Sequence, residues 1–353
     1  MTDTLVDRLV DWDLANATAR RLARPGPTVS AQEAADVVAE LRGLAVGAQP
    51  HVEAITGLHA PSEGAHVLVV DRPGWVAANL VSLRAMLEPV VEKMAARRPA
   101  VANPLVAAVG GKVTGAEAGG MLAFLSTKVL GQYDIHPGGT PRLLLVAPNL
   151  VATEREMDVD PTDFRRWVCL HEETHRVQFT AVPWLRQHLL DQARSLAVDL
   201  APDPSTLAST LEDVARRLPG VLRGDGGSLV DLFATPAQRE RLVTLTAVMS
   251  LLEGHADVVM DEVGPAVVPS VATIRRRFTQ RRGGTDPLDR LLRRLLGIED
   301  KMRQYKDGAR FVRGVVDQVG MAGFNAVWTS PDTLPTPAEI AAPGVWVRRV
   351  HGS

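Results

Sequence analysis

The chain is poor in cysteine and aromatic residues, and it has no long apolar run. Its single cysteine, Cys169, excludes a disulfide within the chain, so a reducing cytoplasm is the expected compartment. Apolar runs such as residues 143–148 are far shorter than the ~20 residues of a spanning helix. The N-terminal segment has early acidic residues and lacks the apolar core of a secretory signal. We therefore expect a cytoplasmic protein with no membrane partner.

The chain also lacks an excess of charge of either sign. Its 39 Lys+Arg and 41 Asp+Glu residues give a formal net charge of −2, without the basic signature of nucleic-acid binders. The basic run at residues 275–282 is therefore interpreted as the solvated end of a helix. We expect no nucleic-acid partner, and the sequence carries no signal for an oligomeric state.

Segments with helical periodicity, separated by Pro and Gly, make up most of the chain. Residues 4–23 predict one helix, and Ser30 predicts an N-cap for a helix that runs toward Leu44. Two short apolar runs, residues 66–70 and 143–148, predict strands. Residues 131–142, GQYDIHPGGTPR, predict a loop, and the chain from Pro161 onward predicts mainly helices. The expected fold class is mainly α (α+β) with a small sheet. We expect one unit over residues 1–353, with a possible division into subdomains 1–160 and 161–353.

The residues that carry chemistry lie in WVCLHEETHRVQF, residues 167–179, which contains HExxH. On a helix, residues four apart share a face, so His171 and His175 can present imidazole nitrogens to one metal ion. Glu172 can then act as general base on water whose pKa the metal lowers. Apolar residues on several sides predict a buried helix. The alternative is a surface helix that carries two histidines and an acidic patch.

Glu173 is unusual, because metallopeptidases usually have an uncharged residue at this position of the motif. A buried carboxylate is costly unless its charge is balanced. We therefore expect Glu173 to face water or to pair with a cation such as Arg176 or Arg165.

A catalytic zinc site needs a third protein ligand, and the best candidate lies in LLEGHAD, residues 251–257. In a predicted helix over about residues 236–261, Glu253 falls on the inward, apolar face, where a metal ion would balance its charge. The alternatives are His255 as the third ligand, or a purely structural ion pair of Glu253.

Other residues have supporting roles in this prediction. Asp257, one turn after Glu253, could accept a hydrogen bond from the non-ligating nitrogen of His171 or His175. Tyr305 and His255 are candidate donors to a developing oxyanion. The alternative for either of these two is a packed residue with a satisfied hydrogen bond.

The strand predicted at residues 143–148 lies just before the HExxH segment. Thermolysin-like enzymes bind extended peptide along such an edge strand, so Asn149 is a candidate for contact with the substrate backbone. Cys169 is interpreted as a small core residue.

Glu253-xxx-Asp257 after HExxH resembles the pattern of the gluzincin metallopeptidases, although the 77 residues between His175 and Glu253 exceed the usual spacing. A wider resemblance covers about residues 65–350. It is to an actinobacterial family described as zinc-dependent metalloproteases and sometimes labelled as associated with deazaflavin coenzyme biosynthesis. The segments that carry it are DRPGWVAANLVSL, VLGQYD, LLLVAPNL, WVCLHEETHRVQFTAVPWL, LLEGHADVVMDEVG, KMRQYKDGARFVRGV and VWTSPDTLPTPAEI.

This resemblance implies a mostly helical zincin-like fold with one Zn²⁺ per chain. It implies that His171, His175 and Glu253 hold the zinc, with Glu172 as general base. The leading hypothesis is a zinc-dependent peptidase. The alternatives are a non-catalytic, metal-stabilised interaction protein, and a metal hydrolase of a small amide or ester linked to coenzyme assembly.

Overall fold

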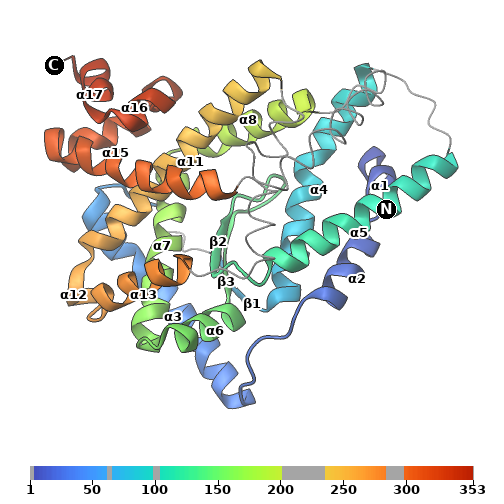
Figure 1. Cartoon of the computed structure of the whole chain (residues 1–353), viewed down its shortest axis with the longest axis horizontal. Helices are drawn as coiled ribbons and strands as arrows, with labels where there is room; N and C mark the ends of the chain where they lie inside the picture. Colours follow the sequence, from blue (N-terminus) through green and yellow to red (C-terminus); the bar gives the residue numbers. More distant parts are fainter. Residues whose placement is uncertain (1–3, 62–65, 98–103, 201–234, 284–297, 353) are drawn as a thin grey trace. The chain divides into compact units, whose positions relative to one another are not determined.

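The computed structural model describes residues 4–61, 66–97, 104–200, 235–283 and 298–352 (Figure 1). Its described elements are mostly helices with one three-stranded sheet, which confirms the predicted fold class. The chain forms two compact units. Unit 1 comprises residues 1–186 and 263–275, and unit 2 comprises residues 187–262 and 276–353. The HExxH segment therefore belongs to unit 1, and the boundary between units does not fall at residue 160.

Unit 1 contains the three strands of the sheet and most of the helices from the first half of the chain. Its strands are β1 (Val67–Val70), β2 (Gly131–Asp134) and β3 (Arg142–Val146). Its helices are α1 (Leu5–Leu9), α2 (Trp12–Leu22), α3 (Ala31–Thr56), α4 (Arg72–Arg97), α5 (Pro104–Leu125), α6 (Ala147–Met157), α7 (Pro161–Ala181) and α12 (Gly264–Val267). Helix α8 (Leu185–Leu200) begins in unit 1 and continues into unit 2 from residue 187. Helix α13 (Val271–Gly283) likewise begins in unit 1 and enters unit 2 at residue 276.

The strand order is β1-β3-β2, so β3 is the middle strand. β1 runs parallel to β3, and β2 runs antiparallel to it, with Gly131 opposite Leu145. Leu144 and Val146 of β3 pack into an apolar cluster with residues of α2, α4 and α5. Alternate side chains of a strand point to opposite faces, so Leu143 and Leu145 face the other way. Helix α7 contacts both β2 and β3 (Figure 1).

Two predictions about the sheet are wrong. Residues 131–134, predicted as part of a loop, form β2, because pairing with the buried strand β3 supplies the hydrogen bonds that four residues could not make locally. The strand predicted at residues 143–148 exists as β3, but it is the middle strand and not an edge strand.

Helix boundaries near the N-terminus also differ from the prediction. Residues 4–23 form two helices, because the side chain of Asp11 accepts a hydrogen bond from the Leu14 amide and caps α2. Ser30 caps α3 as predicted. That helix continues to Thr56, where Gly57 adopts a left-handed conformation, with φ of 66°.

Unit 2 is helical throughout its described part. Besides most of α8, it contains α11 (Pro236–Glu262), α15 (Ile298–Phe324), η1 (Asn325–Trp328), η2 (Pro331–Thr333), α16 (Pro337–Ala341) and α17 (Pro343–His351). Helices α11 and α15 touch through their backbones. A Cβ atom on Gly254 would lie 2.2 Å from the carbonyl carbon of Gly308, and one on Gly308 would lie 1.9 Å from the carbonyl oxygen of Ser250. Glycine at both positions therefore permits the close crossing.

Helix α11 is long and apolar enough to cross a membrane, and among the described helices it alone meets that criterion. However, 56% of its most apolar window is buried within the protein, as in the core helix of a soluble domain. Its composition is thus weak evidence for a membrane segment.

Candidate metal centre

Helix α7 carries the HExxH motif through the interior of unit 1. Asp160 caps its start by accepting a hydrogen bond from the Asp163 amide, and Pro161 occupies the first turn. Residues on several sides of the helix are buried, including Phe164, Trp167 and Cys169. Burial raises the pKa of the Cys169 thiol, and Glu172 and Glu173 raise it further, in keeping with an inert core residue. The prediction of a buried helix is confirmed.

His171 and His175 point their Nε2 atoms at one another, 3.3 Å apart. Their rings are perpendicular, with centroids separated by 4.8 Å. Two imidazole lone pairs aimed at one point repel unless a proton or a cation lies near both, and a metal ion bound by both nitrogens meets that need. The histidine pair therefore fits the metal that HExxH predicts.

Glu172 lies between the two histidines in sequence and is 6% exposed. The backbone of β2 packs directly against its side chain. A Cβ atom on Gly131 would lie 2.5 Å from Cγ of Glu172 and 2.7 Å from Oε1, so no larger residue fits without a shift. Glycine at the start of β2 thus lets the strand pass beside the carboxylate.

Glu173 pairs with Arg176, as predicted for one of its two candidate cations. The Arg176 side chain donates hydrogen bonds of 2.6–2.9 Å to both carboxylate oxygens, and the two side chains are only 1% and 4% exposed. Burial raises the pKa of Glu173, whereas the Arg176 guanidinium acts in the opposite direction. This ion pair balances the extra charge of the motif inside unit 1.

Gln178 is a site residue that the sequence interpretation missed. Its Oε1 atom lies 3.0 Å from Nδ1 of His175, and its side chain is fully buried. An amide oxygen at this distance accepts a hydrogen bond from Nδ1–H, which leaves the lone pair of His175 on Nε2, toward His171. The spacing in the sequence could have revealed this contact, because Gln178 follows His175 by three residues and residues three apart on a helix are neighbours.

Glu253 lies on α11 in unit 2 and is partly buried. The residues on either side of it, Leu252 and Gly254, are buried, and Gly254 belongs to the backbone contact with α15. The helix predicted over about residues 236–261 is α11, and Glu253 lies on it between two buried residues. Its role as the third ligand stays a prediction.

The two candidate oxyanion donors have different environments. His255 is fully buried in unit 2, where its ring stacks on Phe324 at 5.2 Å and lies 5.5 Å from the Trp328 ring. This aromatic packing is that of a core histidine. Tyr305 lies in α15, and its side chain is outside the part of the structure that is described.

Asp257 and Asn149 have partners that the sequence did not predict. The carboxylate of Asp257 lies 3.8 Å from the guanidinium of Arg313 within unit 2. The partner seen at Nδ1 of His175 is Gln178, so the hydrogen bond that Asp257 would accept stays a prediction only for His171.

Asn149 is 2% exposed and lies at the start of α6. Its Oδ1 accepts a 2.7 Å hydrogen bond from Arg72, and its Nδ2 donates to the carbonyl oxygens of Ser126 and Val129. These hydrogen bonds engage both atoms of its side-chain amide, and its contact with substrate stays a prediction. Its side chain holds the interior of unit 1 together, beside a strand that is not at the edge.

Comparisons with known proteins identify a family and a similar solved structure. The family whose profile matches residues 10–347 is described as zincin-like metallopeptidase. A crystal structure from Chloroflexus aurantiacus, described as that of a presumed hydrolase with a novel fold, is similar with 28% sequence identity and a TM-score of 0.70. The match covers 98% of this chain and 100% of the other. The comparison with curated proteins gives no match.

Proposed function

Because the chain belongs to the zincin-like metallopeptidase family, we propose that it is a zinc-dependent hydrolase that cleaves peptide bonds. The observation that carries this proposal is the arrangement on α7. One helix directs Nε2 of His171 and His175 at a common point and places the carboxylate of Glu172 against the backbone of β2. A metal-binding pair and a neighbouring general base are the two parts that metal-assisted hydrolysis requires.

In this proposal His171, His175 and Glu253 hold one zinc ion per chain. Two imidazoles and one carboxylate are a donor set of catalytic zinc sites, in which the fourth position stays open. Zinc, when bound there, supplies a Lewis acid and lowers the pKa of water toward neutrality. The orientation of His175 by Gln178 supports this assignment, since ligand histidines usually hydrogen-bond through their other nitrogen.

Glu172 is the proposed general base. Its carboxylate takes a proton from the attacking water as the water oxygen bonds to the carbonyl carbon of the substrate. It then gives that proton to the amine nitrogen as the carbon–nitrogen bond breaks. We assign the hydrogen bond to the developing oxyanion to Tyr305, because the ring of His255 is enclosed by aromatic side chains.

The position of β2 favours a peptide over a small amide or ester. β2 pairs with β3 on one side, and its other edge pairs with no strand in the described part of the chain. An extended peptide can add to such an edge through main-chain hydrogen bonds. Since Gly131 at the start of β2 lies against Glu172, a peptide on this edge would pass the general base.

The first experiment measures metal content by elemental mass spectrometry, on untagged protein purified without chelator. We expect about one zinc per chain, with loss of zinc in the His171→Ala and Glu253→Ala variants. Glu172→Gln should keep the zinc and abolish peptide hydrolysis. The matched control, Glu117→Gln on the exposed face of α5, should change neither.

Each outcome has a defined consequence. Absence of zinc even after reconstitution would contradict the metal centre, and undiminished hydrolysis by Glu172→Gln would contradict the mechanism. A fourth side chain on the zinc would favour the metal-stabilised interaction protein. An open zinc site that cleaves no peptide in a broad library would favour a small amide or ester.

A further inference from the structure

Unit 1 contains a cavity of about 240 Å³ that no part of the metal centre occupies. Its walls come from α4, α5, β2 and the loop that follows β2. Apolar side chains form much of this wall, among them Leu83, Met86 and Leu122. Polar side chains also line it, including Asn79, Ser82 and Gln132.

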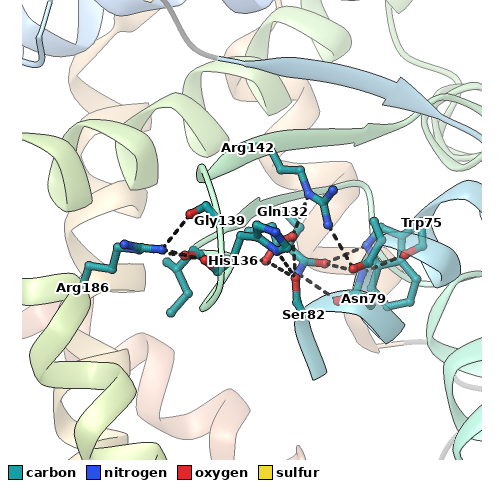
Figure 2. A network of polar contacts seen from close by, with 11 residues as sticks. Trp75, Asn79, Ser82, Gln132, His136, Gly139, Arg142 and Arg186 are labelled. Atoms are coloured by element: carbon teal, nitrogen blue, oxygen red, sulfur yellow. Dashed lines mark hydrogen bonds and ion pairs between the residues drawn. The ribbon is translucent and has the colours of Figure 1, made fainter. Parts of the chain in front are cut away.

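The polar groups of the wall are held by one another, as Figure 2 shows. Gln132 accepts a 2.7 Å hydrogen bond from the indole of Trp75 and donates a 3.0 Å hydrogen bond to Asn79. Asn79 in turn donates to the backbone oxygen of Trp75 at 2.9 Å. Side-chain amides fixed in this way present a rigid surface and need no partner from the ligand.

Asp134 is the charged residue among those that line the cavity, and its charge is balanced. Its carboxylate accepts hydrogen bonds of 2.9 Å from Arg142 and from Ser82. Asp134 is 4% exposed, so its carboxylate offers little accessible negative charge to a group in the cavity. A charged group that entered would lose its hydration without gaining an opposite charge, and the cavity therefore selects against it.

The loop at residues 135–139 closes one side of the cavity and is fastened from α8. The Arg186 guanidinium donates hydrogen bonds of 2.6–3.0 Å to the carbonyl oxygens of Ile135, His136 and Gly139 (Figure 2). His136 is held at a φ of 33°, in the left-handed region that non-glycine residues rarely adopt. This fixed loop indicates that the cavity is preformed.

The cavity lies along the same strand that passes Glu172. Gly131 contacts the general base, and Gln132, Tyr133 and Asp134 line the cavity. A strand rises about 3.3 Å per residue, so the middle of this group is about 7 Å from Gly131. Alternate residues of a strand face opposite sides of the sheet, so Gly131 faces Glu172 while Gln132 and Asp134 face α4 and the cavity. A peptide paired with the outer edge of β2 alternates in the same way. A residue near the scissile bond whose side chain points away from Glu172 would thus reach the cavity mouth.

We propose that this cavity is a substrate subsite that takes one uncharged, apolar side chain, about two residues from the scissile bond. A volume of about 240 Å³ equals about eight water molecules at ~30 Å³ each, which suits a single side chain of the size of Leu, Met or Phe. It is below the ~300–1,000 Å³ of sites for whole small molecules. The inference rests on the proposed peptidase function and names the substrate class for it.

The test profiles cleavage of mixed peptide libraries by the zinc-loaded full-length protein, with each position around the scissile bond varied in turn. We expect one position to prefer Leu, Met or Phe over Ala, Asp and Lys by at least about tenfold in kcat/KM. Met86→Trp, which fills the cavity, should reduce the preference for Leu over Ala at that position by about tenfold. Met121→Trp is the matched control, because Met121 is 50% exposed on α5 and does not line the cavity.

Leu122→Ala, which enlarges the cavity, should shift the preference toward larger side chains and remains informative if Met86→Trp fails to fold. An unchanged profile in the cavity variants, or cleavage without a positional preference, would overturn the subsite alone. If the zinc-loaded wild type cleaves no peptide in the library, the proposed peptidase function fails and this inference fails with it.

Discussion

Replacing Gln178 by leucine removes the acceptor that holds His175, and its effect on zinc affinity can be worked out from the structure. The Oε1 atom of Gln178 lies 3.0 Å from Nδ1 of His175, and the glutamine side chain is 0% exposed. Leucine would therefore leave the Nδ1–H of the half-buried imidazole facing an apolar side chain in place of this acceptor. Loss of a partner for a buried donor costs about 1–3 kcal/mol, and 1.4 kcal/mol is tenfold in affinity.

We accordingly expect Gln178→Leu to weaken zinc binding by about 10–100-fold, the range found when outer partners of metal ligands are removed. Gln178→Glu keeps an acceptor oxygen and should retain affinity better than the leucine variant. Gln187→Leu is the matched control, because Gln187 is exposed and donates a 2.8 Å hydrogen bond only to its helical neighbour Asp191 among the contacts observed.

The assay is a competition titration against a chromogenic chelator at fixed pH, with the thermal stability of the zinc-free proteins measured in parallel. A purely structural role for Gln178 would lower the stability of the zinc-free protein and leave the affinity of the folded protein unchanged. Wild-type zinc affinity in a folded Gln178→Leu variant would refute the reasoning.

Two further predictions concern the packing around the motif. Gly131→Ala should displace Glu172, since the added Cβ would lie 2.5 Å from its Cγ. We expect turnover to fall about tenfold or more with zinc content unchanged. Gly47→Ala, where nothing lies within 4 Å, should leave turnover intact. Arg176→Met should leave the carboxylate of Glu173 buried without its cation and lower the free energy of unfolding by about 3–5 kcal/mol. Denaturant titration measures this loss, and a change below about 1 kcal/mol would show that Glu173 finds another partner or takes up a proton.

Local sequence was a good guide wherever the interacting residues lie within one helical turn. HExxH predicted the facing histidines, and the same periodicity offered Arg176 as a cation for Glu173. Gln178 obeys the same rule and was missed only because its partner atom is the far nitrogen of His175. Ser30 was recognised as a helix cap for the same reason, since capping involves residues close in sequence.

The sequence interpretation missed the features that depend on contacts between distant segments of the chain. Gly131 to Asp134 have neither an apolar run nor an alternating pattern, and they form a strand because β3 lies beside them. Asn149 follows a convincing strand, yet its role depends on Arg72 and on two carbonyl groups from the segment after α5, which no spacing in the sequence indicates.

The sequence by itself determined the facing pair of histidines, the buried character of their helix and the mainly helical fold class, and it offered Glu172 as the candidate general base. These follow from the α-helical period, in which each side chain meets those three and four residues away. Only the tertiary structure decided that β2 is an edge strand passing Glu172, that Gly131 permits this contact, and that a preformed cavity lies along the same strand. Such features depend on pairing between segments far apart in sequence. The free energy of that pairing comes from burial and from hydrogen bonds across the fold, which no local pattern records.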